Sequence, residues 1–200
     1  MSISKRLIMT LAVALLALTF IAGIGMLNLT QAQQRFEYVQ SHIMPSVTTL
    51  AEFRDSVNNS RRLAYRTLVG AYAGNEGAIE KGIPDQDATT DRFLSTYEKN
   101  DVSDAHDRQL IDKDRAALSA YRASRTAFLA KLHAKDFSAA TAELLDGGAV
   151  NSAAVKLDDT ITQHIAYNRK LSDDVRRDSN ASYDHALWVT LVSAGAAFLI

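Results

Sequence analysis

The fold is decided by residues 36–71, which read FEYVQSHIMPSVTTLAEFRDSVNNSRRLAYRTLVGA. Apolar residues recur here in alternating steps of three and four, or in multiples of them, which is the spacing of a heptad seam on one long helix. The seam consists of Phe36, Val39, Ile43, Val47, Leu50, Val57, Ala64, Leu68 and Ala71. The stretch therefore predicts a long helix that packs against other helices.

Two further segments carry a similar seam. One contains Leu110, Asp114, Ala117, Tyr121, Phe128 and Leu132, and the other contains Leu157, Ile161, His164, Asn168, Leu171 and Val175. Turns are expected at the glycines of 70–82 and 147–148 and at the polar run 100–104. We therefore expect helices at about 30–73, 84–100, 104–134 and 149–186, with a short helical turn within 134–146.

Matching seams with short connections predict an all-α fold, namely an antiparallel up-down four-helix bundle flanked by transmembrane helices. Nine Gly and two Pro are too few for the many turns of a β sandwich or barrel. Ser103 or Asp104 is expected to cap the third helix. Pro45 lies inside the first helix, where its missing N–H predicts either a kink or the start of the bundle proper.

The first hydrophobic segment, Leu7 to Leu27, has 21 residues without a charge and would be about 31 Å long as a helix. That length matches the hydrocarbon core of a bilayer and predicts a transmembrane helix over residues 7–29. A cleaved signal peptide is the alternative, but its apolar core is usually shorter, roughly 7–15 residues. Lys5 and Arg6 place residues 1–6 in the cytoplasm by the positive-inside rule.

The chain closes with a second uncharged segment, residues 187–200, which is too short to span a membrane. We interpret it as the truncated start of a second transmembrane helix, with Tyr183 and Trp188 at the membrane interface. Residues 30–186 are then expected to form a periplasmic domain held at the inner membrane.

Composition and motifs argue against several classes of protein. Twenty-two basic and 23 acidic residues give a net charge of -1, which does not suit a nucleic-acid binder. The chain has no Cys, and its five His show neither HxxxH nor HExxH spacing, so no metal site is expected. Because we find no phosphate loop, no G-x-S-x-G and no close pair of carboxylates in an apolar setting, we expect neither an enzyme nor a cofactor.

The chain resembles the amino-terminal part of a bacterial methyl-accepting chemotaxis protein with a four-helix-bundle ligand-binding domain. Four segments carry the resemblance: the basic start and first span, HIMPSVTTLAEFRDSVNNSRRLAYRTLVGAY, DRQLIDKDRAALSAYRASRTAFLAKL, and the junction SYDHALWVTLVSAGAAFLI. It covers essentially the whole chain. The same module also occurs on membrane histidine kinases.

The resemblance implies a domain that binds small molecules, dimerises through its first helix and passes a displacement of its last helix to the cytoplasm. A cytoplasmic kinase and adaptor are reached only through the missing carboxy-terminal part. Aspartate-binding members hold the ligand's carboxylates with an R-x-x-x-R pair, which Arg62 and Arg66 resemble. They carry a further arginine five residues earlier, where this sequence has Val57.

The residues themselves point to the same region. Arg54 and Arg61 occupy seam positions, so each must pair with an acidic group, lie in an open part of the bundle or await an anionic ligand. Arg62 and Arg66 are one turn apart beside Tyr65, and a guanidinium suits a carboxylate because it offers two parallel N–H donors. The alternative is that these arginines pair with neighbouring helices or set the register of a dimer.

Polar residues on other helices are further candidates for the site. Asn151 and Thr160 on the last helix are expected to hydrogen-bond the ligand, although helix capping is the alternative for Asn151. Arg122 and Arg125 either close the pocket or form a solvated face, and the rarity of buried Arg favours the solvated face.

The sequence thus predicts a homodimeric membrane chemoreceptor fragment that senses a small mono-, di- or tricarboxylate. Its predicted ligand-binding residues are Arg61, Arg62, Tyr65, Arg66, Asn151 and Thr160. The alternatives are the sensor of a histidine kinase and a membrane-anchored helical module with a purely structural role.

Overall fold

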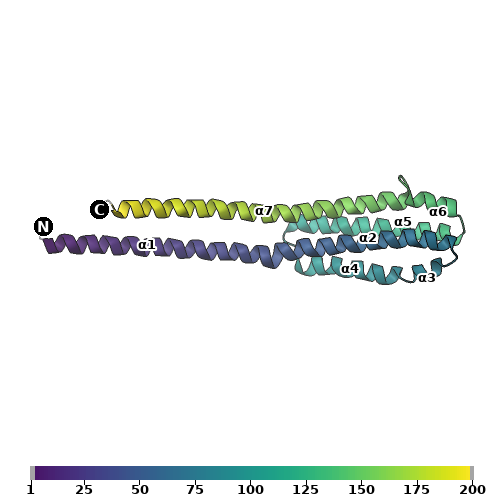
Figure 1. Cartoon of the computed structure of the whole chain (residues 1–200), viewed down its shortest axis with the longest axis horizontal. Helices are drawn as coiled ribbons and strands as arrows, with labels where there is room; N and C mark the ends of the chain where they lie inside the picture. The colour runs from purple at the N-terminus through teal and green to yellow at the C-terminus, as the bar shows by residue number, and fades with distance from the viewer. Residues whose placement is uncertain (1–2, 199–200) are drawn as a thin grey trace. The chain divides into compact units, whose positions relative to one another are not determined.

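The computed structural model describes residues 3–198, which form helices and no strand. Two compact units make up the chain, one of residues 42–170 and one of residues 1–41 with 171–200. The helices are α1 (Ile3–Tyr38), a π-helical turn (Val39–Ile43), α2 (Met44–Tyr72), α3 (Glu76–Glu80), α4 (Ile83–Asn100), α5 (Ala105–His133), α6 (Phe137–Leu144) and α7 (Ala149–Phe198) (Figure 1). The all-α prediction is confirmed.

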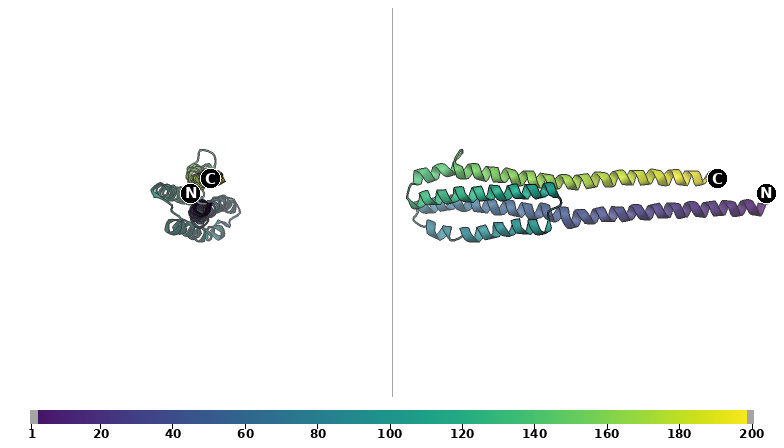
Figure 2. Two further views of the ribbon diagram at one scale, coloured as in Figure 1. Left: turned by 90° about the vertical axis from the view of Figure 1, so that its left-hand side faces the viewer. Right: turned by 180° about the vertical axis from the view of Figure 1, so that it is seen from behind.

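The unit of residues 42–170 is an antiparallel bundle of α2, α4, α5 and the first part of α7 (Figure 2). Its core is apolar and drawn from all four helices. Among the most buried side chains are Leu50, Phe53, Leu94, Ile111, Phe128, Leu157 and Ile161. These positions follow the helical period of the sequence, because only one face of each helix leaves water.

Helix boundaries follow local capping signals. Asp104 caps α5, since its carboxylate accepts the backbone N–H groups of His106 and Asp107 at 2.8 Å. Asp136 caps the short helix α6 by accepting the N–H of Ala139 at 3.0 Å. The predicted cap and the predicted helical turn are therefore both present, whereas α3 was not predicted.

Pro45 lies in the first turn of α2, directly after the π-helical turn. Proline lacks an N–H and its ring clashes with the carbonyl four residues earlier, so a widened turn accommodates it without ending the helical path. The hydroxyl of Ser46 lies 2.8 Å from the carbonyl of Ile43 and supplies a donor there. Pro45 therefore marks the start of the bundle proper, one of the two outcomes that the sequence left open.

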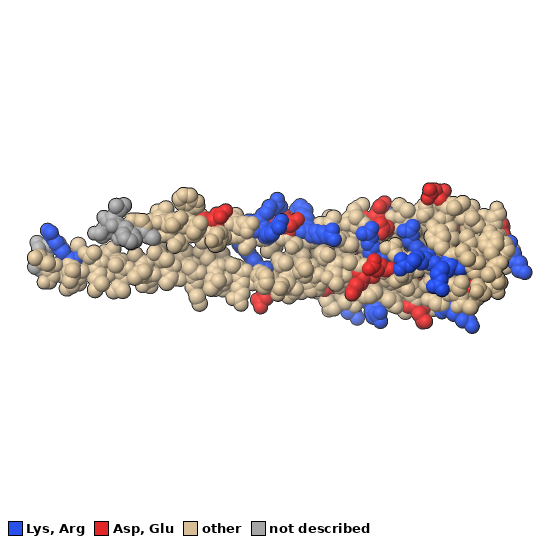
Figure 3. Space-filling model, viewed as in Figure 1, with Lys and Arg blue, Asp and Glu red and all other residues tan. Residues whose placement is uncertain are grey.

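The second unit contains α1 and the end of α7. None of the side chains of α1 is buried, and α1 includes the one described segment that is long and apolar enough to cross a membrane. In Figure 3 most of α1, at the lower left, is tan, with basic residues at its amino-terminal end. Within this unit Arg35 Nη1 donates to the carbonyl of Asp178 at 3.0 Å and to Ser182 at 2.8 Å. The predicted segments 1–6 and 187–200 extend beyond the described residues.

The corner between α6 and α7 depends on two glycines. Gly147 has φ +84°, a conformation that favours glycine. A Cβ on Gly148 would lie 2.2 Å from the carbonyl oxygen of Ala142 and 2.4 Å from that of Glu143. We expect Gly148→Ala to lower the free energy of unfolding by about 1–3 kcal/mol, as overpacking against backbone does.

Thermal unfolding of the full chain in detergent, followed by circular dichroism, measures this effect. Gly77→Ala is the matched control, because a Cβ there would meet nothing within 4 Å and alanine is the better helix former. Equal melting temperatures for the two variants would contradict the prediction.

Candidate functional site

Three of the predicted ligand residues lie together where α2, α6 and α7 meet. Arg61 and Tyr65 on α2 and Asn151 on α7 line a cavity of about 10 Å³. This volume is close to that of a single water probe, so the cavity has no room for a dicarboxylate as it stands. Tyr65 donates its hydroxyl to the carbonyl of Leu144 at 3.0 Å, and Asn151 donates to Asp146 at 3.3 Å.

Arg62 and Arg66 lie on the exposed face of α2 rather than in this cavity. Arg62 donates to the neutral side chain of Asn59. Arg66 borders a shallow pocket of about 340 Å³ together with Tyr65 and Val69. Tyr65 thus lines both the cavity beside Arg61 and the pocket beside Arg66.

Thr160 lies elsewhere, in a groove of about 330 Å³ between α5 and α7. Lys113 and Lys156 stand on its two helices, and alanines line the rest. The hydroxyl of Thr160 donates to the carbonyl of Leu157 at 2.9 Å. The structure therefore places Arg61, Tyr65 and Asn151 at one cavity and Arg66 at the next, whereas Arg62 and Thr160 line neither of these two cavities.

The arginines of α2 differ in their partners. Arg54, at a seam position, forms a bidentate pair with Asp158 on α7, with N–O distances of 2.7 and 3.0 Å. No ion pair with a described residue is found for Arg61, Arg62 or Arg66. The structural alternative thus holds for Arg54, whereas the other three guanidinium groups remain free to meet an anion.

The sequence prediction missed a buried polar cluster at the end of the bundle where α2 begins and α4 ends. We call it the His164 cluster and define it as Tyr97, Asp107, Asp114, His164 and Asn168. Each of its side chains is at most 1% exposed. Its two aspartates are buried on either side of His164, an arrangement that the sequence did not indicate.

His164 stands between the two carboxylates. Its Nε2 lies 2.6 Å from Asp107 Oδ1, and its Nδ1 lies 2.6 Å from Asp114 Oδ2. The hydroxyl of Tyr97 donates to Asp107 at 2.7 Å, and Asn168 donates to that hydroxyl at 2.9 Å. The cluster therefore joins α4, α5 and α7 by charge-assisted hydrogen bonds, which are shorter and stronger than neutral ones.

The fourth long helix joins through Ser46. Its hydroxyl lies 3.0 Å from Asn168 Oδ1. Ser103, in the loop before α5, donates to Asp107 Oδ2 from its N–H at 2.7 Å and from its hydroxyl at 2.9 Å. All four helices of the bundle therefore meet at one polar layer.

The cluster shifts the pKa of each of three groups. Burial of Asp107 opposes ionisation, but hydrogen bonds from His164, Ser103 and Tyr97 outweigh it and lower the pKa of Asp107 to about 2. Burial opposes the charged form of His164 as well, yet Asp107 and Asp114 outweigh it and raise the pKa of His164. The pKa of Tyr97 is raised, chiefly by burial. The directions of the shifts of Asp107 and His164 both favour an ion pair between the imidazolium and the Asp107 carboxylate.

The sequence model of a family described as a four helix bundle sensory module for signal transduction matches residues 1–183. The chain belongs to this family. Its members are sensory modules of methyl-accepting chemotaxis receptors. Neither a search of curated proteins nor a search of solved structures found a match.

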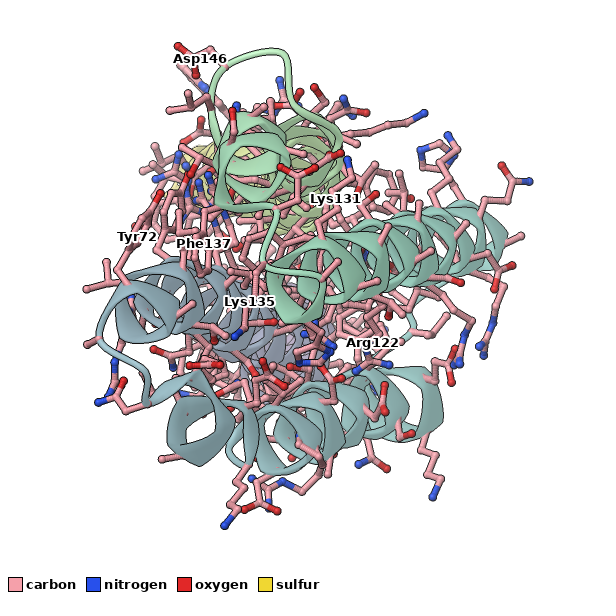
Figure 4. All side chains as sticks on the ribbon, turned by 90° about the vertical axis from the view of Figure 1, so that its right-hand side faces the viewer. Tyr72, Arg122, Lys131, Lys135, Phe137 and Asp146 are labelled. Atoms are coloured by element: carbon pink, nitrogen blue, oxygen red, sulfur yellow. The ribbon has the colours of Figure 1, made fainter. Side chains whose placement is uncertain are left out.

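The sensory module contains a second buried ion pair, which corrects one prediction. Arg125 is only 5% exposed, so it does not belong to a solvated face. Its Nη1 donates to Asp87 at 3.0 Å and to Ser60 at 2.7 Å. Arg122, which lies between α4 and α5 in Figure 4, donates to Asp91 at 2.9 Å. Both arginines thus join α5 to α4 and neither opens toward the predicted ligand residues.

The sensory module's chemistry is that of binding and signalling, and the family is not known as catalytic. Among the described residues no group of three His, Asp or Glu side chains is placed to hold a metal ion. In the His164 cluster both imidazole nitrogens already face carboxylate oxygens. The cluster can hold and release protons, and the arginines of α2 can hold an anion.

Proposed function

We propose that the chain is the sensory portion of a chemoreceptor that binds a small carboxylate outside the cytoplasm. Residues 1–6 lie in the cytoplasm, 7–29 cross the inner membrane, 30–186 form the periplasmic ligand-binding domain and 187–200 start a second transmembrane helix. The proposal rests on the sensory family and on the uncharged first span.

The observation that carries the choice of ligand is the set of arginines without carboxylate partners. Arg61, Arg62 and Arg66 occupy little more than one turn of α2, and no described acidic side chain pairs with them. Arg54 and Arg125 on the same bundle are paired. A carboxylate ligand would give these guanidinium groups the bidentate acceptor that the described residues do not supply.

The same side of α2 supports a homodimer. Val69 and Tyr72 are 69% and 65% exposed, and Tyr65 is 43% exposed. In Figure 4 Tyr72 lies at the end of the bundle beside Phe137, 4.9 Å away between ring centres. A second copy packed along α2 would cover these side chains and enlarge the shallow pocket beside Arg66 into a closed site.

Ligand binding is proposed to move α7 against α2. Asn151 at the start of α7 lines the same small cavity as Arg61 and Tyr65, and Tyr65 also lines the larger pocket beside Arg66. An anion bound in that pocket would therefore act on α7 through Tyr65 and favour one register of the two helices. Shifts of interface helices are typically about 1–2 Å. We propose that a shift of this size, transmitted along α7, is the signal that reports ligand binding.

We expect Arg62→Ala and Arg66→Ala each to weaken carboxylate binding by about 1.5–3 kcal/mol, the usual contribution of a hydrogen bond to a charged group. Isothermal titration of the full chain in detergent with citrate, malate and succinate measures this loss. Helical content is expected to be unchanged, because both side chains are exposed.

Arg115→Ala is the matched control, since Arg115 is an exposed arginine of the bundle that already pairs with Glu98. Its titration is expected to equal that of the parent chain. Unchanged titrations for both Arg62→Ala and Arg66→Ala would place the site elsewhere. The absence of stabilisation by any carboxylate, amino acid or aromatic acid would instead favour the purely structural role.

A further inference from the structure

We propose that the His164 cluster is a proton-binding site, and that its loss of a proton as the pH rises is a second input to this sensory module, independent of any carboxylate ligand. Both nitrogens of His164 lie 2.6 Å from a carboxylate oxygen, one from Asp107 and one from Asp114.

The number of protons required by this geometry follows from the chemistry of the groups. An ionised carboxylate only accepts hydrogen bonds, and a neutral imidazole carries a single N–H. Two short contacts to two carboxylates therefore need a doubly protonated ring. When one proton leaves, one of the two contacts becomes an approach of two acceptors at 2.6 Å, which is repulsive.

Every helix packed around His164 contributes a titratable or polar side chain near its ring. Helix α4 and the turn after it bring Tyr97 and Asp101, and α5 brings Asp107 and Asp114. Helix α7 adds the amide of Asn168 and α2 adds the hydroxyl of Ser46, both neutral. The described contacts of the cluster include no lysine or arginine. His164 is thus the one positive charge that these contacts supply to the two buried carboxylates.

The direction of the pH response follows from the direction in which each pKa is shifted. A histidine with a raised pKa adds stability that is fully present below its ordinary pKa of about 6.5 and is lost as the pH rises through the raised value. The pKa of Asp107, lowered to about 2, keeps that carboxylate ionised above this pH. The pKa of Tyr97 is raised, so its hydroxyl stays protonated. Alkaline pH therefore acts through His164.

Loss of the proton acts on the packing of α7 against α5. The contact between His164 Nδ1 and Asp114 Oδ2 joins these two helices directly, and the other oxygen of that carboxylate, Oδ1, has no described hydrogen-bond partner. A close-packed bundle does not absorb the repulsion gradually, so α7 is expected to settle in a second arrangement. His164 lies six residues before Lys170, the last residue of the bundle unit, which is about 9 Å along α7.

The test uses the full chain in detergent with nitroxide labels at Asp112→Cys and Asp159→Cys. The natural sequence has no Cys, so the labels attach only there, on exposed positions of α5 and α7. The distance between the labels is measured by electron resonance from pH 6 to pH 10. We expect a reversible change of about 1–2 Å as the pH rises, without added carboxylate.

Three variants decide whether His164 is the group that titrates. Asp114→Asn removes one of the two stabilising charges at nearly constant shape, so the midpoint should fall by about 1–3 pH units. His164→Gln should remove the change. His133→Gln is the matched control, a histidine 59% exposed that pairs with Glu80, and it should leave the profile unaltered.

Two results would overturn the proposal. One is a label distance that stays constant over this pH range in the labelled chain without further substitution. The other is an unaltered midpoint in Asp114→Asn. The second result decides the matter even if His164→Gln fails to fold, because Asp114→Asn keeps His164 and its contact with Asp107.

Discussion

Replacing His164 by alanine is expected to lower the free energy of unfolding by about 3–5 kcal/mol at neutral pH, the largest effect of any single substitution considered. Removing one member of a buried ion pair leaves the other charge uncompensated, and this costs more than the pair itself contributes. Here two carboxylates, on Asp107 and Asp114, lose their shared cation. The lost ring also packed edge-on against Tyr97, with ring centres 4.8 Å apart.

Denaturant titration of the full chain in detergent, followed by circular dichroism, measures this loss. His133→Ala provides the comparison, because His133 is 59% exposed and its pair with Glu80 faces solvent. Exposed pairs typically contribute about 0–1 kcal/mol. A loss below 1 kcal/mol for His164→Ala would show that the two carboxylates find other partners or water.

The helices of the bundle could be predicted closely because their ends are marked by local chemistry. The expected helix at 84–100 is α4 (Ile83–Asn100), and the one at 104–134 is α5 (Ala105–His133). Asp104 decides the start of α5 through its own side chain, which accepts two N–H groups of the first turn. Signals of this kind lie within a few residues and need no knowledge of the tertiary fold.

The seam of the first helix is less informative about where the bundle begins. The heptad pattern runs from Phe36 to Ala71 and is interrupted at Arg54 and Arg61. Leu50 is fully buried, whereas Phe36 is 63% exposed. An apolar pattern shows which face of a helix prefers a partner, but it does not say where the partner helices of the same chain end.

The His164 cluster was visible in the sequence only as an irregularity. Asp114, His164 and Asn168 all stand at seam positions where apolar residues are expected. Which of them meet depends on the relative height of α5 and α7, and Asp114 and His164 are 50 residues apart in the chain. Polar seam residues could therefore have been flagged as buried and paired, although their partners follow only from the structure.

For Arg54, Arg61 and Arg125, too, the sequence does not reveal which partner each side chain meets. Arg54 and Arg61 both occupy seam positions, and the sequence offers the same alternatives for each. Only Arg54 has an acidic residue, Asp158, at the matching height of α7. Arg125 was expected on a solvated face because arginine is rarely buried, but Asp87 on α4 lies opposite it. The general rarity of buried arginine thus gave the wrong prediction for Arg125, because a specific partner, Asp87, lies opposite it.

That partner provides the last prediction. Asp87→Ala is expected to lower the free energy of unfolding by about 2–3 kcal/mol, because it leaves the guanidinium of Arg125 buried at 5% exposure without its carboxylate. The loss should stay below that of His164→Ala, since Asp87 is itself 25% exposed and water can approach the vacated site. Ser60 would remain as a neutral acceptor for Arg125.

Asp91→Ala is the matched control for this prediction. Asp91 lies one turn further along α4 and pairs with Arg122, but it is 55% exposed, so its loss should cost less than about 1 kcal/mol. Thermal unfolding of both variants in parallel compares two carboxylates of one helix. Asp87 pairs with the buried Arg125 and also lies 3.4 Å from Arg122 Nε, whereas the exposed Asp91 pairs, among the described residues, with Arg122 alone. Equal losses would mean that water reaches Arg125 as easily as Arg122. The ion pair of Arg125 with Asp87 would then be hydrated, and it would contribute no more to stability than a surface ion pair does.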